Sequence, residues 1–122
     1  AISMLADRYK DGVGVKQSDK KTIELYEMAA KRGNATAQYS LGQSYYQGIY
    51  GLTQSFKRAI KYYTLSAEQG FAEAQYNLGL IYAQGKGIET SFSKARELFT
   101  KAAAQGEESA IKALKQLDKC GV

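Results

Sequence analysis

The side chains that most often perform catalysis or bind metals are scarce in this sequence. It contains no histidine, the commonest general base and the commonest metal ligand. Cys120 is the one cysteine, and without histidine neither a Cys–His nor a Ser–His pair can form. Asp7 and Asp11 are spaced as neighbours on one helix face, where carboxylates are typically exposed to solvent. The sequence therefore predicts no catalytic residue, no metal site and no cofactor.

Two Gly-x-Gly segments resemble loops that bind phosphate. They are Gly12-Val13-Gly14 and Gly85-Lys86-Gly87. A nucleotide-binding loop follows a strand and opens directly into a helix, whereas a helix is expected before each of these segments, so we interpret them as turns. Asn34-Ala35-Thr36 has the form of a glycosylation sequon. Asn34 also stands where a helix needs an N-terminal cap, and we favour the cap.

The composition is that of one folded domain. A length of 122 residues lies within the usual size of a domain, and a hydrophobic fraction of 44% is sufficient for a core. A single cysteine excludes an intrachain disulfide, and the sequence contains neither an apolar run of membrane-spanning length nor a signal peptide. These features favour the cytoplasm. The net charge of +5 raises the alternative of an acidic partner or nucleic acid.

The chain repeats itself. Ala37, Leu41, Gly42, Tyr45 and Gly48 recur 37 residues later at Ala74, Leu78, Gly79, Tyr82 and Gly85, and the same frame begins 36 residues earlier at Ala1. The expected solenoid domain, 1–122, then consists of repeats 1–33, 34–70 and 71–106, with 107–122 as the terminal helix of an incomplete repeat. Because Ala1 aligns with Ala37, no residues remain for a capping turn, and we expect the chain to be part of a longer array.

Each unit has the pattern of two amphipathic helices. Ala37, Leu41 and Tyr45 form one apolar stripe, and Gly42 and Gly79 stand beside such stripes, where we expect a neighbouring helix to approach closely. Neither helix can bury its stripe alone, whereas stacked helix pairs can. The sequence therefore predicts an all-α fold, a right-handed superhelical α-solenoid of antiparallel helix pairs. The expected helices span 1–11, 19–32, 35–47, 54–69, 72–84, 91–105 and 108–119, and glycines 33, 70 and 106 suit left-handed C-terminal caps.

The order of residues resembles the Sel-one-like repeat (SLR) family, which is related to the tetratricopeptide repeat. The matching residues are Ala74, Leu78-Gly79, Tyr82, Gly85-Lys86-Gly87, Lys94-Ala95, Ala102-Ala103 and Gly106. Ala6, Thr22 and Ser66 depart from this pattern. The resemblance covers essentially the whole chain and implies an adaptor that assembles multiprotein complexes. Some secreted bacterial relatives carry a disulfide in each repeat and are linked to β-lactam binding. Because this chain has Cys120 alone, a β-lactam-related hydrolase is the weakest alternative.

Charge distinguishes the two kinds of helix. In solenoids of the family that this chain resembles, the first helix of each repeat lines a concave groove and the second forms the outer layer. The basic residues gather on the second helices and are Lys20, Lys21, Lys31, Arg32, Lys57, Arg58, Lys61, Lys94, Arg96 and Lys101. They form either a phosphate track for nucleic acid or a solvated outer face. We favour the solvated face, the usual place of charged side chains.

The expected binding surface lies on the first helices. Helix geometry places a set of uncharged side chains opposite the packed stripe, and they are Tyr39, Gln43, Tyr46, Gln47, Tyr76, Leu80 and Gln84. Tyrosine is frequent in binding hot spots. Tyr46 is favoured because it does not recur, whereas Tyr39 and Tyr76 recur and suit packing equally well. The sequence thus predicts a scaffold that binds a protein or peptide in the groove, without membrane insertion, as part of a larger repeat protein or complex.

Overall fold

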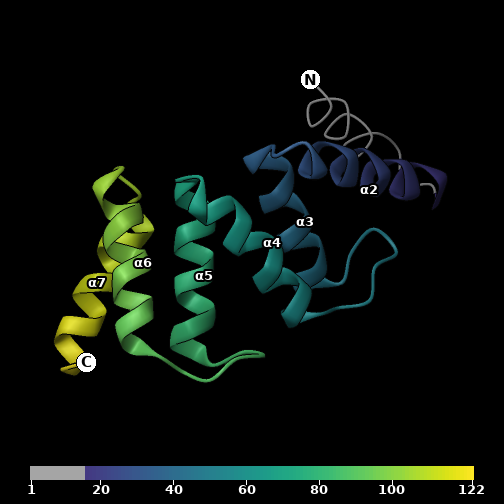
Figure 1. Cartoon of the computed structure of the whole chain (residues 1–122). Helices are drawn as coiled ribbons and strands as arrows, with labels where there is room; N and C mark the ends of the chain where they lie inside the picture. Colours follow the sequence, from purple (N-terminus) through teal and green to yellow (C-terminus); the bar gives the residue numbers. More distant parts are fainter. Residues whose placement is uncertain (1–15) are drawn as a thin grey trace. The chain divides into compact units, whose positions relative to one another are not determined.

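The computed structural model describes residues 16–122, and their side chains from residue 19 on. All regular structure in this part of the chain is helical (Figure 1), which confirms the predicted all-α fold. The helices are α2 (Lys16–Lys31), α3 (Ala35–Gln47), α4 (Phe56–Glu68), α5 (Ala72–Gln84), α6 (Phe92–Ala104) and α7 (Glu108–Cys120). The helix expected at 1–11, with Asp7 and Asp11, and the segment Gly12-Val13-Gly14 lie outside the described residues.

The chain divides within α4 into two compact units, residues 1–62 and 63–122. In the first unit α2 packs against α3, and in the second α5 packs against α6 and α6 against α7. Among the described side chains of the first unit, the buried apolar ones are Ile23, Tyr26, Ala29, Ala30, Ala37, Leu41, Tyr45 and Ala59. Those of the second are Tyr63, Ala67, Ala74, Leu78, Ile81, Ala95, Phe99, Ala102, Ala110 and Leu117. The stripe predicted on α3 is therefore the buried face of that helix.

The helix ends are set by short polar residues and by glycine. Asn34 caps α3, because its Oδ1 accepts a hydrogen bond from the backbone N–H of Ala37 at 2.8 Å. Gly33, Gly70 and Gly106 have φ values of +87°, +85° and +85°, a left-handed conformation that costs glycine little. Both predicted kinds of cap are thus confirmed. α4 begins two residues later than expected because Ser55, just before it, accepts from the N–H of Arg58 at 3.2 Å.

The second Gly-x-Gly segment is a turn. Gly85 directly follows α5 and adopts the left-handed conformation, with φ of +68°. Its N–H donates to the carbonyl of Ile81. α6 begins only at Phe92, with Ser91 as its cap. A phosphate-binding loop would open directly into a helix. The prediction of a turn is confirmed.

A buried glutamine recurs in both units. Gln38 Nε2 donates to the carbonyl of Ala30 at 3.2 Å, and Gln75 Nε2 donates to the carbonyl of Ala67 at 3.2 Å. In each case the acceptor belongs to the last turn of the preceding helix, whose carbonyls lack partners within that helix. Both glutamines are buried, so these bonds fix how one helix follows the next.

Gly79 of α5 lies against the ring of Phe99 on α6. A Cβ atom at this position would be 2.6 Å from Cε1 and 2.8 Å from Cδ1 of Phe99. Carbon atoms in ordinary contact are about 3.5–4.0 Å apart, so only glycine leaves room for the ring. The expected close approach is confirmed at Gly79. Gly42, its equivalent on α3, is likewise buried.

Candidate functional site

The face of α3 opposite its buried stripe is uncharged. The helix contains no charged residue at all. Its four candidate residues, Tyr39, Gln43, Tyr46 and Gln47, recur at intervals of three or four residues, as side chains on one helix face do. Tyr39, Gln43 and Tyr46 are half-buried, and Gln47 is exposed. We call these four side chains the α3 face.

Two glutamines of the α3 face line a small polar pocket. Gln43 and Gln47 share it with hydroxyls and with the loop after α3, and its other lining residues are Tyr26, Ser40, Ser44, Ile49 and Tyr50. The pocket holds about 270 Å³. Within the described residues, neither amide side chain makes a hydrogen bond to the protein. Each amide therefore retains donors and an acceptor for a ligand.

Tyr46 has a packing role as well as an exposed edge. Its ring centroid lies 5.2 Å from that of Phe56, with the rings tilted by 57°. Its backbone carbonyl accepts from Gln54 Nε2 at 2.9 Å. Truncation of Tyr46 would therefore disturb the junction between α3 and α4. Substitution of Gln43 and Gln47 therefore tests binding with less effect on packing than substitution of Tyr46.

On α5, packing covers most of the candidate residues. The ring of Tyr76 lies 5.8 Å from that of Phe99, tilted by 40°. Leu80 packs against the core of the second unit, a cluster formed by Ala95, Phe99, Ala102, Ala110 and Leu117. Gln84 is exposed. The packing alternative left open for Tyr76 thus matches its contacts, and of the three candidates on α5 Gln84 alone is exposed.

The recurring cations of the second helices lie over tyrosine rings. Arg58 Cζ is 5.5 Å from the ring centroid of Tyr45, and Lys94 Nζ is 5.3 Å from that of Tyr82. Such cation–π contacts stabilise by about 0.5–1 kcal/mol at exposed sites. Periodicity alone does not predict these pairs, because it assigns the tyrosines to the core and the cations to solvent. The signal was present, since both partners recur together in each repeat.

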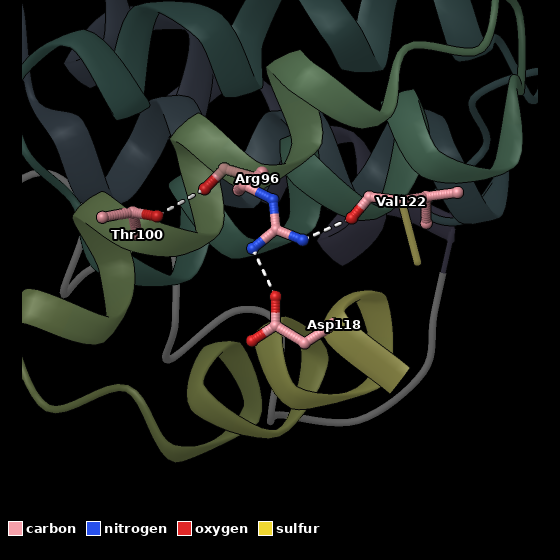
Figure 2. Close-up of polar contacts among 4 residues, drawn as sticks. All are labelled: Arg96, Thr100, Asp118 and Val122. Atoms are coloured by element: carbon pink, nitrogen blue, oxygen red, sulfur yellow. Dashed lines mark hydrogen bonds and ion pairs between the residues drawn. The ribbon is translucent and has the colours of Figure 1, made fainter. Parts of the chain in front are cut away.

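Arg96 of α6 also has protein partners (Figure 2). Its Nη1 pairs with Oδ1 of Asp118 at 2.8 Å, and its Nη2 donates to the carbonyl of Val122. The Arg96 carbonyl accepts from the hydroxyl of Thr100 at 2.7 Å. Arg58, Lys94 and Arg96 are thus engaged within the protein. Lys31, Arg32 and Lys57 are exposed and make no such contact with residues 16–122. A continuous phosphate track is disfavoured by this arrangement.

The described residues carry no recognisable metal centre. Among them, no group of three or more Cys, Asp or Glu side chains is arranged to hold an ion, and Cys120 is exposed and unpaired with another cysteine. None of the described helices is both long and apolar enough to cross a membrane. The chemistry available on the α3 face is therefore hydrogen bonding and apolar contact.

Comparison with known proteins agrees with the resemblance seen in the sequence. The pattern of the Sel1 repeat family matches residues 1–34, 35–71 and 72–107. A crystal structure of a protective antigen present in uropathogenic Escherichia coli strains, displaying an SLR fold, is 33% identical with a TM-score of 0.91, over 99% of this chain and 26% of that one. A Sel1 repeat protein from Oxalobacter formigenes is 28% identical with a TM-score of 0.86, over 95% of this chain and 47% of that one. This chain spans less than half the length of either. No curated protein matches the sequence.

Proposed function

Because this chain belongs to the Sel1 repeat family, whose repeats generally mediate protein interactions, we propose that it is a scaffold that binds a partner protein or peptide on its first helices. Proteins of this family are typically non-catalytic. The observation that carries the proposal is the α3 face. It is uncharged, it includes two glutamines whose amides make no hydrogen bond to the described residues, and it borders a pocket of about 270 Å³.

The chemistry of the α3 face suits a peptide backbone. A glutamine side chain offers an N–H₂ donor and a carbonyl acceptor. The donor can bond the C=O of a peptide, and the acceptor can bond a peptide N–H. Gln43 and Gln47 are one helix turn apart, so both can bind one extended segment. Tyr39 and Tyr46 flank them with aromatic surface of the kind that is enriched in binding hot spots. On α5, Gln84 is the exposed candidate and extends the same chemistry to the second unit.

The test uses a partner captured from the source cell on the immobilised chain, then purified and titrated. Gln43→Ala combined with Gln47→Ala removes both amides, and alanine is the best helix former, so the helix is preserved. Each hydrogen bond contributes about 0.5–1.5 kcal/mol. Two such bonds contribute about 1–3 kcal/mol, so the double variant should bind about 5- to 150-fold more weakly.

The matched control is Lys31→Gln combined with Lys57→Gln, which removes two exposed cations from the second helices. It should bind the partner within about twofold of wild type, since exposed charges contribute little. If the glutamine variant bound the partner as tightly as wild type and the lysine variant did not bind it, the partner would bind on the second helices. The proposal would then be wrong.

A further inference from the structure

Three departures from the repeat pattern meet in the polar pocket beside the α3 face. Gln43 stands where the next repeat has Leu80, and Ser44 stands where that repeat has Ile81. Tyr50 belongs to the loop between α3 and α4, which is one residue longer than the loop between α5 and α6. Gln43, Ser44 and Tyr50 all line the pocket of about 270 Å³. At this one place, the second repeat has therefore exchanged apolar side chains for polar ones.

The exchange at Ser44 removes apolar burial from the fold. Ser44 and its equivalent Ile81 are both 1% exposed, and a buried hydroxyl stabilises a fold less than a buried alkyl group does. The Ser44 hydroxyl donates to the carbonyl of Ser40 at 2.8 Å, so it is satisfied within α3. Serine is also smaller than isoleucine, and the space that an isoleucine would fill contributes to the pocket.

Tyr50 has a backbone conformation that is uncommon for a tyrosine. Its φ of +57° lies in the left-handed region, which favours glycine and disfavours bulky side chains. Residues held in such conformations cluster at binding sites. Tyr50 lines the pocket together with Ile49 and with Tyr26, which is 1% exposed. We interpret Tyr50 as a wall of the pocket, above a buried floor.

The lining of the pocket offers hydrogen bonds without charge. Among the described residues, no Lys, Arg, Asp or Glu lines it. Gln43 and Gln47 each retain N–H donors and a carbonyl acceptor, since neither amide bonds to the described residues. A carboxylate offers acceptors alone and an ammonium group offers donors alone, and either charge would leave water without gaining a counter-ion. A primary amide is neutral and offers both donors and an acceptor.

We propose that the pocket binds the side-chain amide of an asparagine or glutamine of the partner. The ligand amide donates to the carbonyl of one pocket glutamine and accepts from the N–H₂ of the other. The remaining N–H groups and lone pairs of Gln43 and Gln47 stay available to the backbone of the bound segment. The assignment rests on the proposed function, because it names the residue that the α3 face selects in a bound peptide.

The experiment is an NMR titration that follows the side-chain N–H₂ signals of Gln43 and Gln47 at pH 7. The probes are capped pentapeptides Gly-Ala-X-Ala-Gly, in which X is Gln, Asn, Glu, Asp or Leu. We expect the tighter-binding of the two amide peptides to bind at least about tenfold more tightly than its carboxylate counterpart and than the leucine peptide. Equal binding of the carboxylate counterpart would overturn the selection of a neutral group. Equal binding of the leucine peptide would overturn the amide site.

The decisive variant is Gln43→Leu combined with Ser44→Ile, which gives α3 the pair that α5 carries at Leu80 and Ile81. The new side chains should fill the pocket with apolar groups, and binding of the amide peptide should fall at least about tenfold. Far-UV circular dichroism checks that the variant is folded. Unchanged binding by the folded variant would overturn the proposal.

Tyr50→Gly tests the wall of the pocket without replacing any pocket glutamine. Glycine accepts the left-handed backbone of this position at little cost, so the fold should be preserved. Without the ring, water reaches a bound carboxylate, and the preference for the amide peptide over its carboxylate counterpart should fall to within about threefold. An unchanged preference would contradict the role of Tyr50.

A control and a comparison separate this proposal from the proposed function. Gln84→Ala, at the position equivalent to Gln47, should leave peptide binding within about twofold of wild type, since Gln84 does not line the pocket. If only the amide assignment is wrong, all the pentapeptides bind alike while the captured partner still loses affinity in Gln43→Ala combined with Gln47→Ala. If only the proposed function is wrong, the captured partner ignores that variant while the amide peptides keep their preference.

Discussion

The substitution Gly79→Ala adds one methyl group that has two opposing effects on stability, a gain in helix propensity and a steric overlap. Alanine stabilises a helix interior by about 1 kcal/mol relative to glycine. The added Cβ, however, would stand 2.6 Å and 2.8 Å from two carbons of the Phe99 ring, about 1 Å inside ordinary contact. Either the ring or the backbone must move.

The ring of Phe99 has little freedom to yield. It is 1% exposed, it contacts the ring of Tyr76, and it belongs to the buried cluster with Ala95 and Ala102. Overpacking of such a site costs about 1–3 kcal/mol. Subtracting the gain in helix propensity leaves a net destabilisation of about 1 kcal/mol, with steric overlap as the larger effect.

Urea denaturation followed by far-UV circular dichroism measures this difference. The sharper test is the same substitution in a Phe99→Leu background, where the ring is absent. There Gly79→Ala should change sign and stabilise the protein by up to about 1 kcal/mol, because only the helix propensity remains. If Gly79→Ala stabilised the wild-type protein, or had the same effect in both backgrounds, the argument from close approach would be refuted.

Two further predictions concern polar groups. Gln75→Ala removes the bond to the Ala67 carbonyl and the acceptor of Gln105 Nε2, so it should lower the free energy of unfolding in urea by about 1–3 kcal/mol. Gln84→Ala, on the exposed side of the same helix, should change this free energy by no more than about 0.5 kcal/mol. Equal effects of the two variants would contradict the role of the buried bonds. Because the pKa of Tyr62 is raised above its usual 10.0 by burial, the folded protein retains this proton more tightly than the unfolded chain, so the stability it contributes is present below pH 10 and is lost as the pH rises through the folded pKa. Tyr62→Phe should therefore lose less stability than wild type in an alkaline denaturation series, and parallel curves would contradict the burial of this hydroxyl.

The sequence was sufficient to predict features that depend on one helix at a time. The stripe of Ala37, Leu41 and Tyr45, the Asn34 cap and the turn at Gly85 all follow from spacing or from a single residue's backbone preference. Gly79 could be predicted as well, because a glycine within an amphipathic helix requires a reason in the packing. These are local properties, and one chain carries enough information to identify them.

Contacts between side chains of different helices could not be predicted in the same way. Periodicity assigns a residue to a face but does not identify its neighbour. Leu80 was expected to face a ligand, yet the core of the second unit partly covers it. The pair Arg58–Tyr45 and the pocket beside Gln43 depend on how side chains from separate helices meet.

The central claim is that the partner binds through uncharged groups of the first helices. The most direct measurement is the affinity of the captured partner at 50 and 200 mM salt. If the partner binds through hydrogen bonds and apolar contact, its affinity should change by less than about tenfold between these salt concentrations. The triple variant Lys31→Gln, Arg32→Gln and Lys57→Gln should show the same small change. A nucleic acid contacting six to ten phosphates would instead lose about 10³- to 10⁵-fold in affinity over this range, and such a loss, reduced by the cation variant, would contradict the account.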